Sequence, residues 1–141
     1  MSSRFYNEVI KPTISDIKVD LDEEFDKNFE RKSYFNGSKW APTKRPYSRG
    51  SLMVRSGALR RGMKSTSKSD GLTYTSDKPY ARIHNEGGTI KFKSRKGSVK
   101  MPKRQFIGRG KNVDKIIREI ADENIAAYFK KYNLLEKISK L

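Results

Sequence analysis

The fold of this chain is decided by residues 78–108, KPYARIHNEGGTIKFKSRKGSVKMPKRQFIG, which separate two stretches with helical periodicity. A proline beside an aromatic residue and then a glycine pair open the stretch. Between residues 89 and 102, apolar residues alternate with cations, as in a β-ribbon with side chains on two opposite faces. Ser94–Gly97 is the expected tip. The pattern predicts a basic β-hairpin over about 89–102.

The alternation gives the predicted hairpin two chemically different faces. One face is apolar and contains Ile90, Phe92, Val99 and Met101; the other is polar and contains Lys91, Lys93, Ser98 and Lys100. An isolated two-stranded ribbon is only marginally stable in water. We therefore expect this hairpin to be mobile unless a partner holds it.

Helical periodicity is present on both sides of this stretch. The first predicted helix covers about 14–33, with Thr13 as its N-cap, and the last covers about 112–131 and is followed by a short tail. The apolar stripe of the first helix consists of Ile14, Ile17, Leu21, Phe25 and Phe29. The apolar stripe of the last helix can continue along the tail through Leu134, Leu135 and Ile138.

The remaining residues predict a loop and short strands. Residues 35–50 contain Gly37 and two prolines and are expected to form an extended loop, whose aromatic residues, among them Trp40, pack over the first helix. The β region covers about 52–108: a helical turn near 52–59, an antiparallel pair at 63–67 and 72–76, and Tyr80–His84 as either a strand end or a helical turn.

The predicted class is α+β, in one domain of residues 1–141. Its small antiparallel sheet is covered by an N-terminal helix and a long C-terminal helix, and the basic hairpin protrudes.

The charge of the chain is concentrated in its middle. The net charge is +16, and residues 31–111 alone carry twenty-two basic and three acidic side chains, a net +19. Such a field attracts phosphate backbones or acidic protein surfaces. The alternative is that these charged side chains are solvated at the surface and bind no partner.

The composition excludes several kinds of chemistry. The chain has no cysteine and a single histidine, His84. With so few acidic residues in the middle region, a two-metal nuclease is hard to assemble. His84 with Glu86 is the only candidate pair of base and carboxylate, and a packing role of His84 beside Gly87 and Gly88 is favoured over it. We expect no enzymatic activity, no cofactor and no bound metal.

The sequence shows no long apolar run. No segment approaches the ~18 apolar residues of a membrane span, and the first residues lack the apolar core of a signal peptide. We expect a soluble protein with no membrane partner, made in a cytoplasm.

The candidate contact surface is the cationic side of the hairpin and its flank. Lysine and arginine side chains there can meet phosphates without reading sequence. The rival interpretation is that they meet acidic protein surfaces in an assembly. The candidates are Lys91, Lys93, Arg95, Lys96, Lys100, Lys103 and Arg104.

Four motifs in a fixed order resemble a known family. They are Trp40-Ala-Pro42, Ser56-Gly57-Ala58-Leu59-Arg60 after Leu52, Tyr80-Ala-Arg-Ile-His84 with Gly87-Gly88, and Pro102-Lys-Arg104-Gln-Phe106-Ile-Gly108. Together with the terminal helix, they make residues 15–130 similar to the phage virion morphogenesis proteins. These are tail completion proteins of the Mu G and P2 S type, related to the neck proteins of long-tailed phages. Asn85-Glu86 and the highly cationic hairpin depart from the usual family pattern.

The resemblance implies a structural virion protein rather than an enzyme. It implies a homo-oligomeric ring, typically of six copies, at the neck, where the protein caps the tail tube and joins it to the head connector. The implied partners are the neighbouring tail-tube or terminator and head-connector proteins, with DNA in the lumen. The alternative from charge alone is a sequence-independent basic nucleic-acid-binding domain. The residues that carry the motifs have structural roles in this interpretation: Trp40, Gly57, Leu59, Tyr80, His84, Gly87, Gly88, Pro102, Arg104, Phe106 and Gly108.

Overall fold

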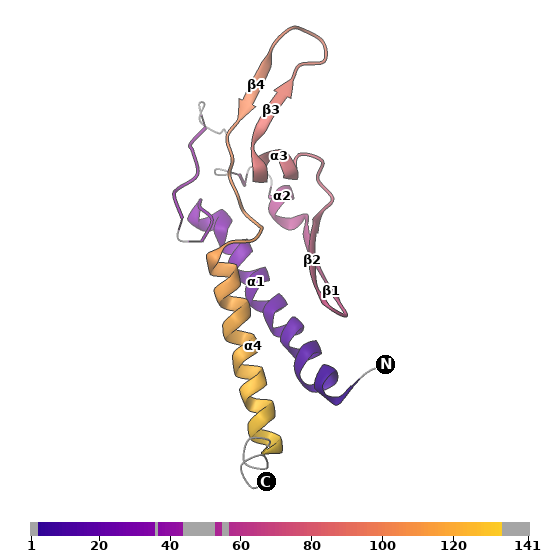
Figure 1. Ribbon diagram of the computed structural model, residues 1–141. Coiled ribbons are helices and arrows are strands. Elements are labelled where there is room, and N and C mark those ends of the chain that lie inside the picture. The colour runs from indigo at the N-terminus through magenta and orange to yellow at the C-terminus, as the bar shows by residue number, and fades with distance from the viewer. Residues whose placement is uncertain (1–2, 36, 44–52, 55–56, 134–141) are drawn as a thin grey trace. The chain divides into compact units, whose positions relative to one another are not determined.

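The computed structural model describes residues 3–35, 37–43, 53–54 and 57–133. Its helices are η1 (Tyr6–Ile10), α1 (Lys11–Arg31), α2 (Ala58–Arg61), α3 (Ala81–Glu86) and α4 (Lys111–Tyr132). Its strands are β1 (Met63–Lys68), β2 (Gly71–Ser76), β3 (Gly88–Lys91) and β4 (Ser98–Met101). The predicted α+β class is confirmed. The strands form two separate two-stranded antiparallel sheets: β1–β2, which is the small sheet, and β3–β4, which is the predicted basic hairpin (Figure 1).

The chain divides into two compact units. One contains residues 1–21, 66–73 and 109–141, and the other contains residues 22–65 and 74–108. The candidate contact residues all belong to the second unit. The prediction of one domain over residues 1–141 stays a prediction.

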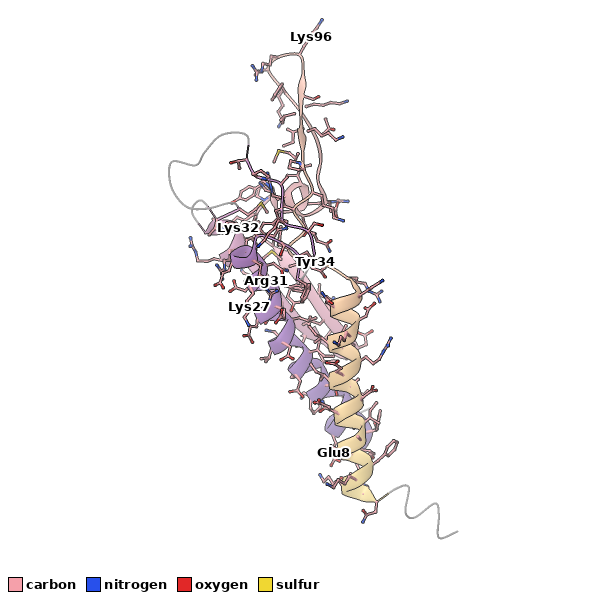
Figure 2. The ribbon with its side chains drawn as sticks, turned by 90° about the vertical axis from the view of Figure 1, so that its left-hand side faces the viewer. Glu8, Lys27, Arg31, Lys32, Tyr34 and Lys96 are labelled. Carbon is pink, nitrogen blue, oxygen red and sulfur yellow. The ribbon has the colours of Figure 1, made fainter. Side chains whose placement is uncertain are left out.

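In the first unit, the N-terminal helical segment runs antiparallel to α4. Asn124 donates a hydrogen bond to the Thr13 hydroxyl at 2.9 Å, and Tyr132 donates to the Glu8 carboxylate at 2.6–2.7 Å. Figure 2 shows Glu8 beside the C-terminal end of α4. The ring of Phe5 meets Tyr128 edge-on at 5.4 Å. Low-numbered residues of one helix thus meet high-numbered residues of the other.

The helix prediction for residues 14–33 was wrong at its start. Thr13 is buried inside the helix, where its hydroxyl accepts the bond from Asn124, so it does not cap the N-terminus. The helical path begins at Arg4, with the π turn of η1 before Pro12. A proline lacks the N–H of an α-helical bond and its ring crowds the carbonyl four residues back, and a wider turn relieves this conflict. Helix α4 lies within a residue of its predicted range, and the proposed continuation along the tail falls outside the described residues.

The core of the second unit is aromatic. Phe29 of α1 contacts Trp40 and Phe106, with ring centroids 5.8 and 5.2 Å away. Leu59, Met53 and Ala81 complete this buried cluster. The prediction that Trp40 packs over the first helix is confirmed. The part of the 35–50 loop after Thr43 lies outside the described residues.

Polar side chains of α1 bind α2 and those residues of β1 and β2 that belong to the same unit. Asp22 accepts hydrogen bonds from Tyr74 at 2.6 Å and from Ser65 at 2.9 Å. Arg60 pairs with Asp26 through both carboxylate oxygens at 2.6 Å. Two of the acidic residues that the sequence concentrates in the first helix, Asp22 and Asp26, therefore bind other parts of this unit.

Candidate interaction surface

The base of the β3–β4 ribbon is fixed by the segment Arg104–Gly108, whose backbone is bound by side chains from distant parts of the chain. The Asn85 side-chain oxygen accepts the N–H groups of Phe106 and Ile107 at 2.9 and 3.1 Å. The Trp40 indole donates to the Gln105 carbonyl at 3.0 Å, and the Tyr34 hydroxyl donates to the Gly108 carbonyl. Buried backbone groups need such partners. No strand in the described part of the chain pairs with this segment, so side chains supply the partners.

Asn28 makes the most deeply buried of these contacts. Its side chain is 0% exposed, donates to the Phe106 carbonyl at 3.0 Å and accepts the Phe35 N–H at 2.7 Å. Sequence reasoning missed Asn28, Asn85 and Tyr34. The one feature of the sequence that could have indicated a buried role for Asn28 is its position directly beside Phe29, in an otherwise apolar stripe.

Arg104 is buried, in contrast to the surface cation that its charge suggested. The residue is 5% exposed, and its guanidinium donates to the Ala41 and Pro42 carbonyls at 2.8 and 3.4 Å. Its own N–H donates to the His84 carbonyl at 2.9 Å. The prediction that Arg104 belongs to the exposed contact surface is therefore wrong. Its side chain joins two segments of the second unit.

Gly87 is placed where no other residue fits well. Its φ is 75°, in the left-handed region, and a Cβ there would lie 2.9 Å from the backbone nitrogen of Lys103. Side chains are strained in this region, and backbone atoms cannot move aside cheaply. The tight approach brings the two ends of the ribbon together.

The other motif residues lie around this base. Tyr80 precedes α3 and its ring meets His84 edge-on at 6.0 Å. Gly57, with a φ of 75°, precedes α2, which contributes Leu59 to the core. Leu52 and Ser56 fall outside the described residues. The remaining motif positions follow the same segment: Gly88 begins β3, Pro102 follows β4, Phe106 is in the core and Gly108 ends the anchored segment.

His84 and Glu86 do not form a catalytic pair. Residues 81–86 are helical, so two positions turn the side chains about 200° apart. Glu86 instead accepts from Arg82 at 3.0 Å. The His84 Nδ1 is buried and has no hydrogen-bond partner among the described residues. Burial, with a smaller contribution from the Arg104 charge, lowers the pKa of the imidazole. A neutral packed histidine fits these contacts.

The ribbon itself has the two predicted faces, but β3 ends at Lys91, so the connection between the strands is longer than the expected tip at Ser94–Gly97. Ile90 pairs with Val99 and Lys91 with Ser98, which puts the apolar pair on one side and the lysine with the serine on the other. Ile90 and Val99 remain 40% and 39% exposed. The Arg95 guanidinium lies over the Phe92 ring at 4.3 Å. Figure 2 shows Lys96 at the outer end of the ribbon.

Six cations lie on the ribbon and its flank, in a stretch of sequence without acidic residues. Residues 88–103 contain no aspartate or glutamate. Within the described ranges, no ion pair joins these cations to a carboxylate, and all six residues are exposed. They are Lys91, Lys93, Arg95, Lys96, Lys100 and Lys103. The structure therefore leaves all the predicted contact cations except Arg104 on the surface.

A groove of about 570 Å³ runs along β4. Its walls are residues 41–43 on one side and Val99 and Met101 on the other, with His84 and Arg104 also lining it. Among the described residues, no cluster of histidines and carboxylates could hold a metal ion. No helix in the described part of the chain is long and apolar enough to cross a membrane.

Comparison with known families agrees with the motifs. A model of the phage virion morphogenesis family matches residues 7–126. The chain belongs to this family. No curated protein and no solved structure gives a significant match. Membership supports a structural role in phage assembly and an association with the virion.

Proposed function

We propose that the protein completes the phage tail at the head–tail junction. Copies of the chain, six in the expected arrangement, form a ring around the DNA path that caps the tail tube and meets the head connector. The family match supports the assembly role. The observation that carries the finer assignment is the acid-free cationic ribbon held on a hydrogen-bonded base, because a projecting element of one charge suits contact with a large anionic partner.

Assembly tests this proposal directly. Purified protein mixed with phage tails or with head connectors is expected to form a defined ring, visible by negative-stain microscopy and by light scattering. A stable monomer that associates with neither component would refute the proposal. In purified virions, a label at the C-terminus is expected at the neck.

A second candidate function is sequence-independent nucleic-acid binding. It is favoured by the six exposed cations, none of which has a carboxylate partner among the described residues. Binding of this kind loosens with salt, because each phosphate contact releases counterions and the slope of log affinity against log salt is about −0.9 per neutralised phosphate on duplex DNA. No binding at low salt would exclude it.

A pair of variants with equal charge loss locates the binding surface. The triple variant Lys93→Gln, Arg95→Gln, Lys96→Gln removes three cations from the ribbon tip. The control removes three exposed cations from α4, with Lys111→Gln, Arg118→Gln and Lys130→Gln. If the ribbon contacts DNA, only the first variant flattens the salt slope. Equal effects would mean that binding follows net charge alone.

A further inference from the structure

The β3–β4 ribbon has two strand edges that no described segment covers. Phe92 N–H donates to the Gly97 carbonyl at 3.1 Å, and bonded pairs alternate in an antiparallel ladder. The pairs Ile90–Val99 and Gly88–Met101 therefore bond inward. The backbone groups of Thr89 and Lys91 on β3, and of Ser98 and Lys100 on β4, point outward. Within the described residues, β3 and β4 pair only with each other.

We propose that these edges join copies of the chain, with the outer edge of β4 in one copy pairing with the outer edge of β3 in the next. The inference rests on the proposed ring. Successive copies related by rotation present β3 and β4 alternately, so every new pair is antiparallel, as in the ribbon itself. Such a head-to-tail contact closes when the rotation closes.

The charge pattern selects one register for this pairing. In the ribbon, each lysine lies opposite a hydroxyl residue: Lys91 faces Ser98 and Lys100 faces Thr89. If β4 of one copy pairs with β3 of the next copy at the same level and in the same register, the pattern repeats. Ser98 of one copy then lies beside Lys91 of the next copy, and Lys100 lies beside Thr89 of the next copy. A shift by two residues would place Lys100 opposite Lys91, and like charges directly opposite are destabilising. The level register alternates lysine and hydroxyl around the whole sheet.

The apolar face supports the same register. Ile90 and Val99, each about 40% exposed in one copy, would form a continuous band around the assembly. The two outward pairs at each junction also supply backbone hydrogen bonds for Thr89, Lys91, Ser98 and Lys100. Each face of the ribbon thus continues into a like face of the next copy, with the cations together on one side.

Cysteine cross-linking tests the register, because the chain has no cysteine of its own. A Lys91→Cys variant and a Ser98→Cys variant, one carrying a mass tag, are mixed, assembled and mildly oxidised. The bonded pair places the two Cα atoms about 5.5 Å apart, within disulfide reach. We expect the mixed disulfide dimer and little of either homodimer, since equivalent residues of adjacent copies are separated by a whole strand.

The matched control mixes Thr89→Cys with Ser98→Cys, which are diagonal neighbours at ~7–8 Å and are expected to cross-link poorly. Amide exchange of the unmodified protein is a second measurement. On assembly, the amides of Lys91 and Ser98 should gain protection, whereas those of Ile90 and Val99 are bonded already. A ring without the mixed disulfide and without this protection overturns the edge pairing but leaves the ring intact. No ring at all refutes the proposed function instead.

Discussion

The side-chain amide of Asn28 donates a hydrogen bond to the carbonyl oxygen of Phe106, across 78 positions of sequence, with 3.0 Å between nitrogen and oxygen. The same side chain accepts the Phe35 N–H. One fully buried residue of α1 thereby ties two irregular segments of the second unit to a helix. Irregular backbone inside a core is stable only when such bonds are complete.

Replacing Asn28 with alanine is expected to lower the free energy of unfolding by about 2–4 kcal/mol, because two buried backbone groups lose their partners. Urea unfolding followed by tryptophan fluorescence measures the change, since Trp40 lies in the same core. Asn112→Ala, at an exposed position of α4, is the control and should change stability by less than about 0.5 kcal/mol. Equal stability of the two variants would contradict the structural role of Asn28.

Gly87→Ala is expected to destabilise the protein by about 2 kcal/mol or more. The left-handed backbone penalises a side chain, and the new Cβ would lie within 3.1 Å of backbone atoms of Lys103 and Met101. Gly71→Ala is a matched control, because a Cβ at Gly71 meets no atom within 4 Å. Thermal unfolding of both variants gives the comparison. A larger loss for Gly71→Ala would contradict this account of the ribbon base.

Local patterns in the sequence were enough to predict the two hairpins and the two long helices, apart from the start of α1. Alternation identified the β3–β4 hairpin and its two faces, the Asp70-Gly71 turn identified β1–β2, and helical periodicity identified α1 and α4. Each of these signals comes from neighbours a few positions apart. The α+β class follows from their order.

The anchoring of Arg104–Gly108 could not be predicted in the same way. The bonds from Asn28 and Asn85 join residues 78 and 21 positions apart, and no period marks them. Arg104 was counted as a surface cation because charge alone does not distinguish a buried guanidinium from an exposed one. Its position two residues before the buried Phe106, on the same side of an extended segment, is the signal that was available.

Arg104→Lys is expected to lower the free energy of unfolding by about 1–3 kcal/mol although the charge is kept. A lysine cannot reproduce the fork that reaches the Ala41 and Pro42 carbonyls together. Lys103→Ala, at the exposed neighbour, should leave stability within about 0.5 kcal/mol of the unmodified protein. Guanidinium unfolding distinguishes the two, and an undisturbed Arg104→Lys variant would return this residue to the set of surface cations.

The stability of the protein is expected to fall in mild acid because of His84. Burial and the nearby Arg104 charge lower the pKa of this histidine in the folded state, so between the folded and unfolded pKa values the unfolded chain binds more protons. The contribution is fully present above the unfolded value of about 6.5 and is lost as pH falls through the lower folded value. One proton limits the slope to about 1.4 kcal/mol per pH unit.

The His84 contribution can be isolated because His84 is the only histidine. The free energy of unfolding of the protein and of a His84→Gln variant is measured from pH 7.5 to pH 5.5, and the difference between the two curves is the histidine term. We expect the free energy of unfolding of the unmodified protein to fall relative to that of the variant as the pH falls, because only the unmodified protein has this histidine to protonate. Parallel curves would mean that His84 titrates alike in both states, and an advantage that grows in acid would mean that the folded protein prefers the imidazolium.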